Sequence, residues 1–399
     1  MNFIPAVLMF FIQDAILLYR RKKKHKLLKM KEIRTILINR KKFEYCGFAL
    51  FALLSLSACG NSSDVEKSVG NEQAHDNEQL ISPTKKVTEL EDGLSTVSFE
   101  GDYGFDTFLE NGGASSDSAV VDFLSSELLG QVSGLAFTSN GFGCSTLSVK
   151  NNEGQQLFGR NFDWQKSNAQ IVKVSPENGY RSISTVNLDF LDGYDNYLKL
   201  IPGEAKNIPV IYAPMDGMNE EGLTAAVLVI EDSDVINQTT EKPDLTTTTA
   251  IRLLLDKAAT VDEAIALLEQ YDMNSSMGLM VHFSLSDRSG KSVVVEYVDN
   301  QMIVTETPIV TNFYLAEGEK KGLGSQQSHE RFEILSRQLE ATPVMNEEQV
   351  KNALDSVSKD DFGEFESTEW SIVYNQTAGQ LHYYHRENYD KRFIFELEK

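Results

Sequence analysis

The stretch FGCSTLSVKNNEGQQLFGRNFDW, residues 142–164, decides the fold of this 399-residue chain. Cys144 opens a run of alternating residues that predicts a strand, and NNEG at 151–154 is typical of a hairpin turn. The returning strand carries Arg160 and Asp163, so pairing of the two strands brings all three side chains to one end of a hairpin. A guanidinium beside a thiol lowers the thiol pKa, and a carboxylate can orient a nucleophile or its amine. The hairpin therefore predicts a site built around a nucleophilic cysteine.

Strands and helices follow this hairpin in blocks. Short runs typical of strands, among them LTAAVLVI, LMVHFSLSD, SVVVEYV, SIVYN, LHYYH and RFIFEL, lie on either side of a helical block. That block, TTTTAIRLLLDKAATVDEAIALLEQY, predicts two amphipathic helices with threonine caps, and SHERFEILSRQLE and NEEQVKNALDSV predict two more. The pattern predicts layered sheets covered by helices.

The N-terminal region carries the features of an export signal. Basic residues 40–42 precede the apolar run GFALFALLSLSA, which is the layout of a secretory signal peptide. The run ends in LSAC, residues 56–59, which resembles a bacterial lipobox and implies a lipid on Cys59. At 12 residues the run is shorter than the ~20 that span a bilayer. We predict a signal region at residues 1–59, with translation starting at Met30; an ordinary signal peptide, or a membrane segment upstream of that start, is the alternative.

Two further segments precede the catalytic domain, which we place at residues 144–399. Residues 60–93 are polar and contain no aromatic residue, so they bury too little apolar area to fold alone and predict a flexible tether. Residues 94–143 contain apolar residues at near-helical spacing around Val120 and Leu128. They predict a pro-segment that packs on the enzyme.

Charge and cysteine content limit the function. Outside residues 1–59 the chain has 25 Lys and Arg against 56 Asp and Glu, so its surface repels phosphate backbones and we expect no nucleic-acid partner. Only Cys144 lies outside the signal region, and an unpaired thiol in an exported protein needs a chemical reason, unless it is a small buried hydrophobe. The six histidines have no metal-ligand spacing, so we expect neither a metal nor another cofactor.

The ordered motifs from Cys144 onward resemble the N-terminal nucleophile (Ntn) cysteine hydrolases: choloylglycine hydrolases, penicillin V acylases and, more distantly, acid ceramidase. MDGMNEEGL with Asn219 resembles a turn of that family, VTN with Asn312 its oxyanion asparagine, and SHERF with Arg331 its second active-site arginine. WSIVYNQTAGQLHYYHRENYD resembles its closing strand pair. The resemblance covers residues 144 to about 392. It implies an α+β fold, the αββα sandwich of antiparallel sheets covered by helices, and hydrolysis of linear non-peptide amides.

The site residues then receive roles. A terminal α-amine has a pKa of about 7.7 to 8.0, so the amine of Cys144 can accept the thiol proton before the thiolate attacks the amide carbonyl. Asn312 is expected to donate to the oxyanion, and Asp163 to hold the protonated amine. Arg160 and Arg331 are expected to stabilise negative charge around the sulfur.

Three positions qualify this resemblance. Val229 stands where bile salt hydrolases carry Asn and penicillin V acylases carry Tyr, so only its backbone N–H can serve as an oxyanion donor. Asn219 is interpreted as a turn residue with a structural role. Gly143 precedes Cys144 in the chain, so the α-amine becomes free only when the bond between them is cut. Acid ceramidase-like enzymes achieve this by self-cleavage, and we predict autoproteolysis here.

We therefore predict an exported, lipid-anchored cysteine amidohydrolase at the extracytoplasmic face of a bacterial membrane. Its substrate is a small N-acyl compound: a fatty acyl amide, an acyl amino acid or homoserine lactone, a conjugated bile acid or a penicillin V type β-lactam. One alternative is a catalytically silent lipoprotein that binds an acyl ligand in the same pocket. Another is a papain-like protease, which would need a base among His282, His329, His382 and His385.

Overall fold

The computed structural model describes residues 78–397, apart from 129–134, 138–142, 166, 195–198, 200, 202, 232 and 361–365. The predicted signal region, the lipidation site at Cys59 and residues 60–77 of the predicted tether lie outside the described residues. Within the described part, no helix is both long enough and apolar enough to cross a membrane.

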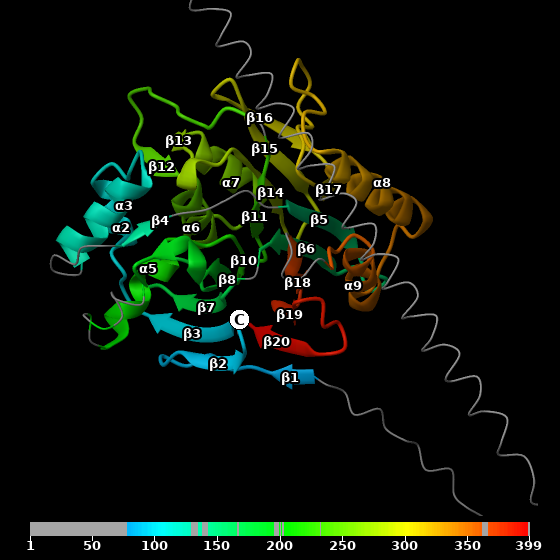
Figure 1. Cartoon of the computed structure of the whole chain (residues 1–399), viewed down its shortest axis with the longest axis horizontal. Coiled ribbons are helices and arrows are strands. Elements are labelled where there is room, and N and C mark those ends of the chain that lie inside the picture. Colours follow the sequence, from blue (N-terminus) through cyan, green and yellow to red (C-terminus); the bar gives the residue numbers. More distant parts are fainter. Residues whose placement is uncertain are drawn as a thin grey trace, which may run out of the picture. The chain divides into compact units, whose positions relative to one another are not determined.

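Two large sheets form the centre of the protein (Figure 1). The first sheet contains β1 (Glu78–Leu80), β5 (Gly143–Lys150), β6 (Gln156–Trp164), β17 (Ile309–Val310), β18 (Ser367–Asn375), β19 (Gln380–His385) and β20 (Arg392–Glu396). The second contains β2 (Thr88–Glu91), β3 (Leu94–Glu100), β7 (Ala169–Ser175), β8 (Ser182–Asn187), β10 (Asp216–Asn219), β11 (Thr224–Val229), β14 (Val281–Ser286), β15 (Ser292–Val298) and β16 (Gln301–Glu306). Two short pairs are β4 (Ala136–Phe137) with β9 (Leu191–Asp192), and β12 (Asp244–Thr246) with β13 (Asp272–Asn274).

The strand order is β1-β20-β19-β18-β6-β5-β17 in the first sheet and β16-β15-β14-β11-β10-β8-β7-β3-β2 in the second. Neighbours are antiparallel except β1 beside β20 and β3 beside β7. The sheets face each other directly: Thr146 on β5 and Ser284 on β14 share a hydrogen bond of 2.9 Å between their hydroxyls. Every residue of β6 and β18 is buried, because the second sheet covers one of their faces and a helix covers the other.

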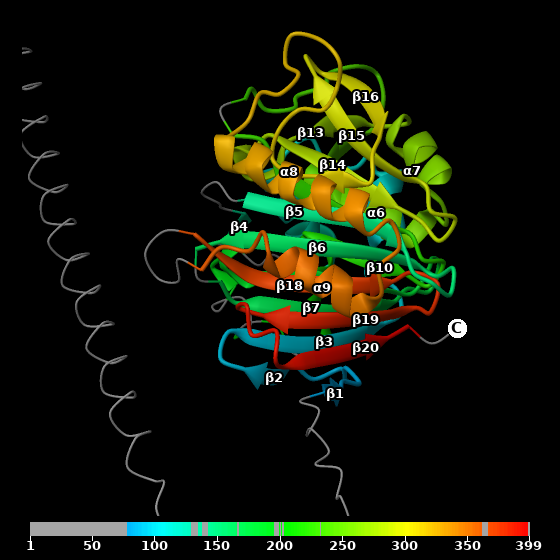
Figure 2. The ribbon, with the colours of Figure 1, turned by 90° about the vertical axis from the view of Figure 1, so that its right-hand side faces the viewer.

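Helices form the two outer layers. The helices of the described part are α2 (Phe105–Glu110), α3 (Asp117–Phe123), α5 (Ile208–Ile211), α6 (Thr247–Lys257), α7 (Val261–Leu268), α8 (Gln326–Ala341) and α9 (Glu347–Asp355). Figure 2 shows α8 and α9 lying across the first sheet, over β5, β6 and β18, while α6 and α7 pack on the second sheet. The αββα sandwich predicted from the sequence is confirmed.

The predicted helix caps are present. Thr246 caps α6 and Thr260 caps α7, each by accepting a backbone N–H of the first turn through its side chain. Ser325 does the same for α8 and Asn346 for α9. These local bonds explain why the four helices begin where the sequence pattern places them.

The hairpin around the candidate nucleophile also forms as predicted. β5 and β6 pair with Cys144 opposite Phe162, Thr146 opposite Arg160 and Gly143 opposite Asp163. Because β5 is buried except at Lys150 and β6 is buried throughout, this register brings the start of β5 and the end of β6 together at a buried point.

The predicted tether ends earlier than residue 93. Residues 78–80 form β1, which pairs with β20, and residues 88–91 form β2, which pairs with β3. β1 and β2 are edge strands, and one side of an edge strand remains in water. They can therefore be polar, and their composition did not predict strands. Residues 78–80 and 88–91 are therefore part of the folded sheets.

The described part of the predicted pro-segment packs on the catalytic domain. β3 lies parallel to β7 over seven paired positions, from Leu94 opposite Ala169 to Glu100 opposite Ser175. Val120 on α3 and Leu124 in the π-helix Leu124–Leu128 are fully buried. The segment thus supplies a strand of the second sheet and part of the core.

Candidate active site

Cys144 lies at the start of β5 and is fully buried. Its backbone N–H donates to Asn312 Oδ1 at 2.6 Å, and its Sγ lies 3.8 Å from the carbonyl oxygen of Val227 on the opposite sheet. Burial is the largest influence on the thiol and raises its pKa; Arg160 opposes this, Asp163 adds to it, and Arg331 opposes it again. In the uncut chain the thiol is therefore held in its protonated, less nucleophilic form.

Arg160 reaches the sulfur environment from the middle of β6. Its guanidinium donates to the Val227 carbonyl at 3.0 Å and to Asp216 Oδ2 at 3.2 Å, and both charged side chains are fully buried. Asp216 also accepts from the Trp370 indole and the Tyr374 hydroxyl, each at 3.0 Å. An arginine held on several sides is a fixed positive charge beside the thiol.

Asp163 lies opposite Gly143 in the hairpin. Its Oδ1 accepts from the Thr368 hydroxyl at 2.7 Å, while its buried Oδ2 receives no hydrogen bond from any described residue. Arg331 Nη1 and Lys359 Nζ stand 3.7 and 3.8 Å from that oxygen. A buried carboxylate oxygen without a donor is costly, so its presence here calls for a functional reason.

Asn312 and Arg331 complete the group. Arg331, on α8, donates to Asn312 Oδ1 at 2.8 Å and to the Ser145 hydroxyl at 2.7 Å, and it also contacts the carbonyl of Cys144. Asn312 Nδ2 donates to the carbonyl of Val229 at 2.7 Å. The structure thus brings Cys144, Arg160, Asp163, Asn312 and Arg331 together; their catalytic roles stay predictions.

Val229 contacts the candidate site, whereas Asn219 lies away from it. The contact that Val229 makes with Asn312 runs through its carbonyl, and the oxyanion role of its N–H stays a prediction. Asn219 is engaged elsewhere: its side chain donates to the carbonyls of Leu255 and Ala258 at 3.1 and 2.7 Å and accepts from Leu223 N at 3.1 Å. Those bonds tie a turn to α6, and the structural role of Asn219 stays a prediction.

Three residues of this site escaped the sequence analysis. Asp216, which orients Arg160, stands in the MDGMN motif only three positions before Asn219 and could have been noticed there. Lys359 and Glu366 form an ion pair of 2.6 Å next to Gly143. No local pattern marks them, because they come from a loop far from the hairpin in sequence.

The match to a protein-family model begins at Cys144. Residues 144–313 match the family model of the linear amide C-N hydrolases, choloylglycine hydrolase family. This match covers less than half of the chain. A penicillin V acylase of Pectobacterium atrosepticum is 28% identical over 155 residues, which are 36% of this chain and 41% of that protein. The match thus spans less than half of the relative's length.

Solved structures also resemble the chain, at lower sequence identity. A conjugated bile acid hydrolase from Clostridium perfringens is 18% identical, with a TM-score of 0.48 over 64% of this chain and 92% of that one. A penicillin V acylase from Agrobacterium tumefaciens is 21% identical, with a TM-score of 0.45 over 64% and 86%.

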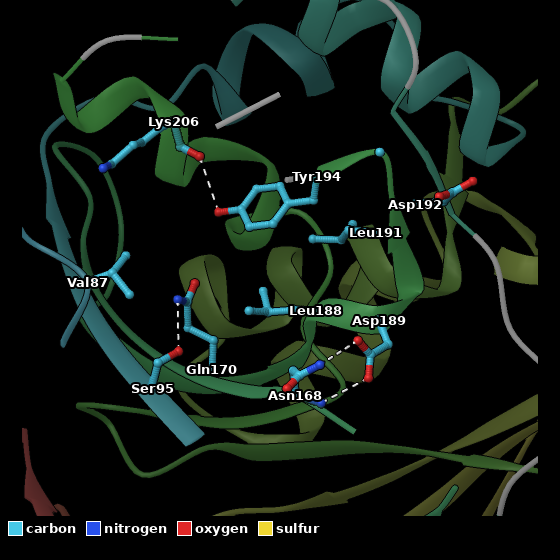
Figure 3. A pocket seen from close by; sticks show the side chains of 11 residues that line it. Val87, Ser95, Asn168, Gln170, Leu188, Asp189, Leu191, Asp192, Tyr194 and Lys206 are labelled. Carbon is cyan, nitrogen blue, oxygen red and sulfur yellow. Dashed lines mark hydrogen bonds between the residues drawn. The ribbon is translucent and has the colours of Figure 1, made fainter. Parts of the chain in front are cut away.

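A cavity of about 740 Å³ is lined by residues of the second sheet and of the segment 188–206 (Figure 3). Figure 3 shows Leu188, Leu191 and Tyr194 along one side of it, with Gln170 directed at Ser95 on the other. None of the candidate catalytic residues lines this cavity. Among the residues that the structure describes, no group of three His, Cys, Asp or Glu side chains is arranged to hold a metal ion.

Proposed function

We propose that this protein hydrolyses the linear C–N amide bond of an N-acyl compound, with Cys144 as nucleophile once it is the first residue of a cut chain. The family match, which starts at residue 144, supports this assignment. So does the convergence of a thiol, two arginines, a carboxylate and a carboxamide at one buried point.

The observation that carries the proposal is the unsatisfied Oδ2 of Asp163. It lies opposite Gly143, the residue whose carbonyl forms the peptide bond with Cys144. Cutting that bond turns the Cys144 amide into an α-amine, which is about half protonated near its pKa of 7.7 to 8.0. The resulting ammonium is the hydrogen-bond donor that the buried carboxylate lacks.

The catalytic cycle then follows from the contacts. The neutral α-amine of Cys144 takes the thiol proton, and the thiolate attacks the substrate carbonyl. Asn312 Nδ2 carries two N–H groups; one donates to Val229, and the other is available to the oxyanion. The C–N bond breaks, the α-ammonium returns the proton to the leaving amine, and an acyl-cysteine remains. Water then attacks this thioester, which releases the acid and restores the thiol.

Export and anchoring through a lipid on Cys59 belong to the same proposal. Because β1 begins at Glu78, the segment between Cys59 and the first described strand comprises residues 60–77. An extracytoplasmic enzyme would meet small amides from outside the cell. Radiolabelled-lipid incorporation that is lost in Cys59→Ala tests this part of the proposal.

A turnover screen tests the activity. Purified cut protein is offered N-acyl amides of varied chain length, conjugated bile salts and penicillin V, and the released amine is measured. Turnover of at least one class supports the proposal. Binding of an acyl ligand without turnover of any amide would instead support the silent lipoprotein.

Cleavage between Gly143 and Cys144 is the first prediction. The thiol attacks the Gly143 carbonyl, the C–N bond breaks to free the amine, and water hydrolyses the Gly143 thioester. Intact-mass analysis of wild-type protein should give two pieces that co-purify, because β3 remains paired with β7. A fully active chain that is continuous through Gly143 would contradict the terminal-amine mechanism.

Gly143→Ala is expected to slow this cleavage by roughly tenfold or more, since misplacement of reacting groups by about 1 Å has effects of that order. A Cβ there would lie 2.5 Å from Glu366 Oε1, 2.7 Å from Lys359 Nζ and 3.0 Å from Asp163 Oδ2, so it must displace this cluster. The ratio of cut to uncut chain over time gives the rate. An unchanged rate in a variant with wild-type Tm would refute the prediction.

A further inference from the structure

A buried histidine–glutamate pair stands behind the candidate oxyanion asparagine. His282 on β14 and Glu296 on β15 are both fully buried, with Nδ1 and Oε1 separated by 3.0 Å. His282 is one of the four histidines that could serve as the base under the alternative hypothesis of a papain-like protease. The contacts of its ring are with Glu296 and with a backbone carbonyl.

The pair holds the backbone on both sides of Asn312. His282 Nε2 donates to the carbonyl of Thr311, the preceding residue, at 2.7 Å. Glu296 accepts the backbone N–H of Leu315 at 2.9 Å and that of Ala316 at 2.6 Å. The segment that carries Asn312 is thus fixed at two points to the second sheet, just after it leaves β17 in the first sheet.

The hydrogen bonds of His282 and Glu296 also fix where the protons of this pair lie. The Thr311 carbonyl has no hydrogen, so Nε2 must donate to it, and the facing lone pairs of Nδ1 and Oε1 would repel without a proton between them. The pair therefore shares a proton and carries no net charge. Charge-assisted bonds of this kind are short and directional, which suits a part whose task is to hold geometry.

A third contact comes from α8. The backbone N–H of Asn312 donates to the Ser328 hydroxyl at 2.6 Å, and Ser328 in turn donates to the Thr311 hydroxyl at 2.9 Å. Arg331, on the same helix, binds Asn312 Oδ1. Helix α8 thus holds Asn312 directly through Ser328 and Arg331, while the histidine–glutamate pair holds the backbone on either side of it.

We propose that His282 and Glu296 are positioning residues for amide hydrolysis, which act by holding the Asn312 carboxamide at Cys144. The inference rests on the proposed function. The pair binds the backbone at Thr311, Leu315 and Ala316, around the residue that we expect to meet the reacting carbonyl, and this placement is what favours a positioning role.

Kinetics of Glu296→Gln and Glu296→Ala test the inference. The glutamine keeps one oxygen for a backbone N–H, so kcat is expected to fall roughly 3- to 10-fold; the alanine keeps none, and the expected fall is roughly 10- to 100-fold. KM should stay within about twofold of wild type, because the effect is confined to the transition state. Rates are expressed per folded molecule, and the amide is one that the wild type turns over.

A double-mutant cycle separates positioning from general stability. If the pair acts through Asn312, then Glu296→Gln should lower kcat by less than about twofold in an Asn312→Ala background. Asp256→Asn is the matched control, because it breaks another buried ion pair. Asp256 Oδ1 lies 2.6 Å from Arg252 Nη2 within α6. This variant should lower Tm and leave kcat unchanged.

Three outcomes would overturn the inference. One is an unchanged kcat in both Glu296 variants, and another is an equal loss with and without Asn312. The third is a rise in KM alone. Absence of turnover in the wild type would instead overturn the proposed function itself, and the inference with it. If Glu296→Ala does not fold, the double-mutant cycle of Glu296→Gln and Asn312→Ala still tests the inference.

Discussion

Cys144→Ala is expected to abolish amide hydrolysis, with kcat reduced by roughly 10⁴-fold or more, and to leave the chain uncut at Gly143. The thiol is the nucleophile in both reactions, and loss of a covalent nucleophile has effects of this size. The fold should survive. The side chain is buried but small, and replacing it by a methyl group should cost about 1 kcal/mol of stability.

Cys144→Ser separates nucleophilicity from size. The hydroxyl occupies nearly the same volume, but its alkoxide is far harder to generate than a thiolate, so little activity should remain. Hydrolysis rates and intact mass are measured together on both variants. Activity of the alanine variant above a tenth of wild type would rule out Cys144 as nucleophile, and a cut alanine variant would point to an outside protease.

Asn312→Ala is expected to lower kcat by roughly 10²- to 10³-fold with a smaller change in KM, the usual result of removing one oxyanion donor. In the uncut chain the side chain already touches the reacting residue, since its Oδ1 accepts from Cys144 N. Steady-state kinetics on any amide that the wild type hydrolyses measures the effect. A change in KM alone would assign Asn312 to substrate binding.

Asn219→Ala is the matched control for that variant. Both asparagines are buried and each makes several hydrogen bonds to the backbone, but those of Asn219 tie a turn to α6. Its loss should lower Tm and leave kcat per folded molecule near wild type. An equal fall in kcat for the two variants would mean that Asn312 acts only by stabilising the fold.

The sequence sufficed for the features that depend on neighbours in the chain. The β5–β6 hairpin could be predicted because its turn and its alternation are local, and the register that places Arg160 and Asp163 near Cys144 follows from pairing alone. The four capped helices could be predicted for the same reason. Asn312 and Arg331, distant in sequence, were found through the resemblance, since no spacing rule connects them to Cys144.

By itself, then, the sequence determined the sandwich, the hairpin and the set of candidate catalytic residues. Only the tertiary structure decided how those residues are held. Glu78 pairs with Arg392, His282 reaches the carbonyl of Thr311, and Asp163 Oδ2 is left buried without a donor. These contacts depend on which segments, distant in sequence, lie next to each other and on which polar atoms are thereby excluded from water. Both are determined only when the two sheets pack against each other.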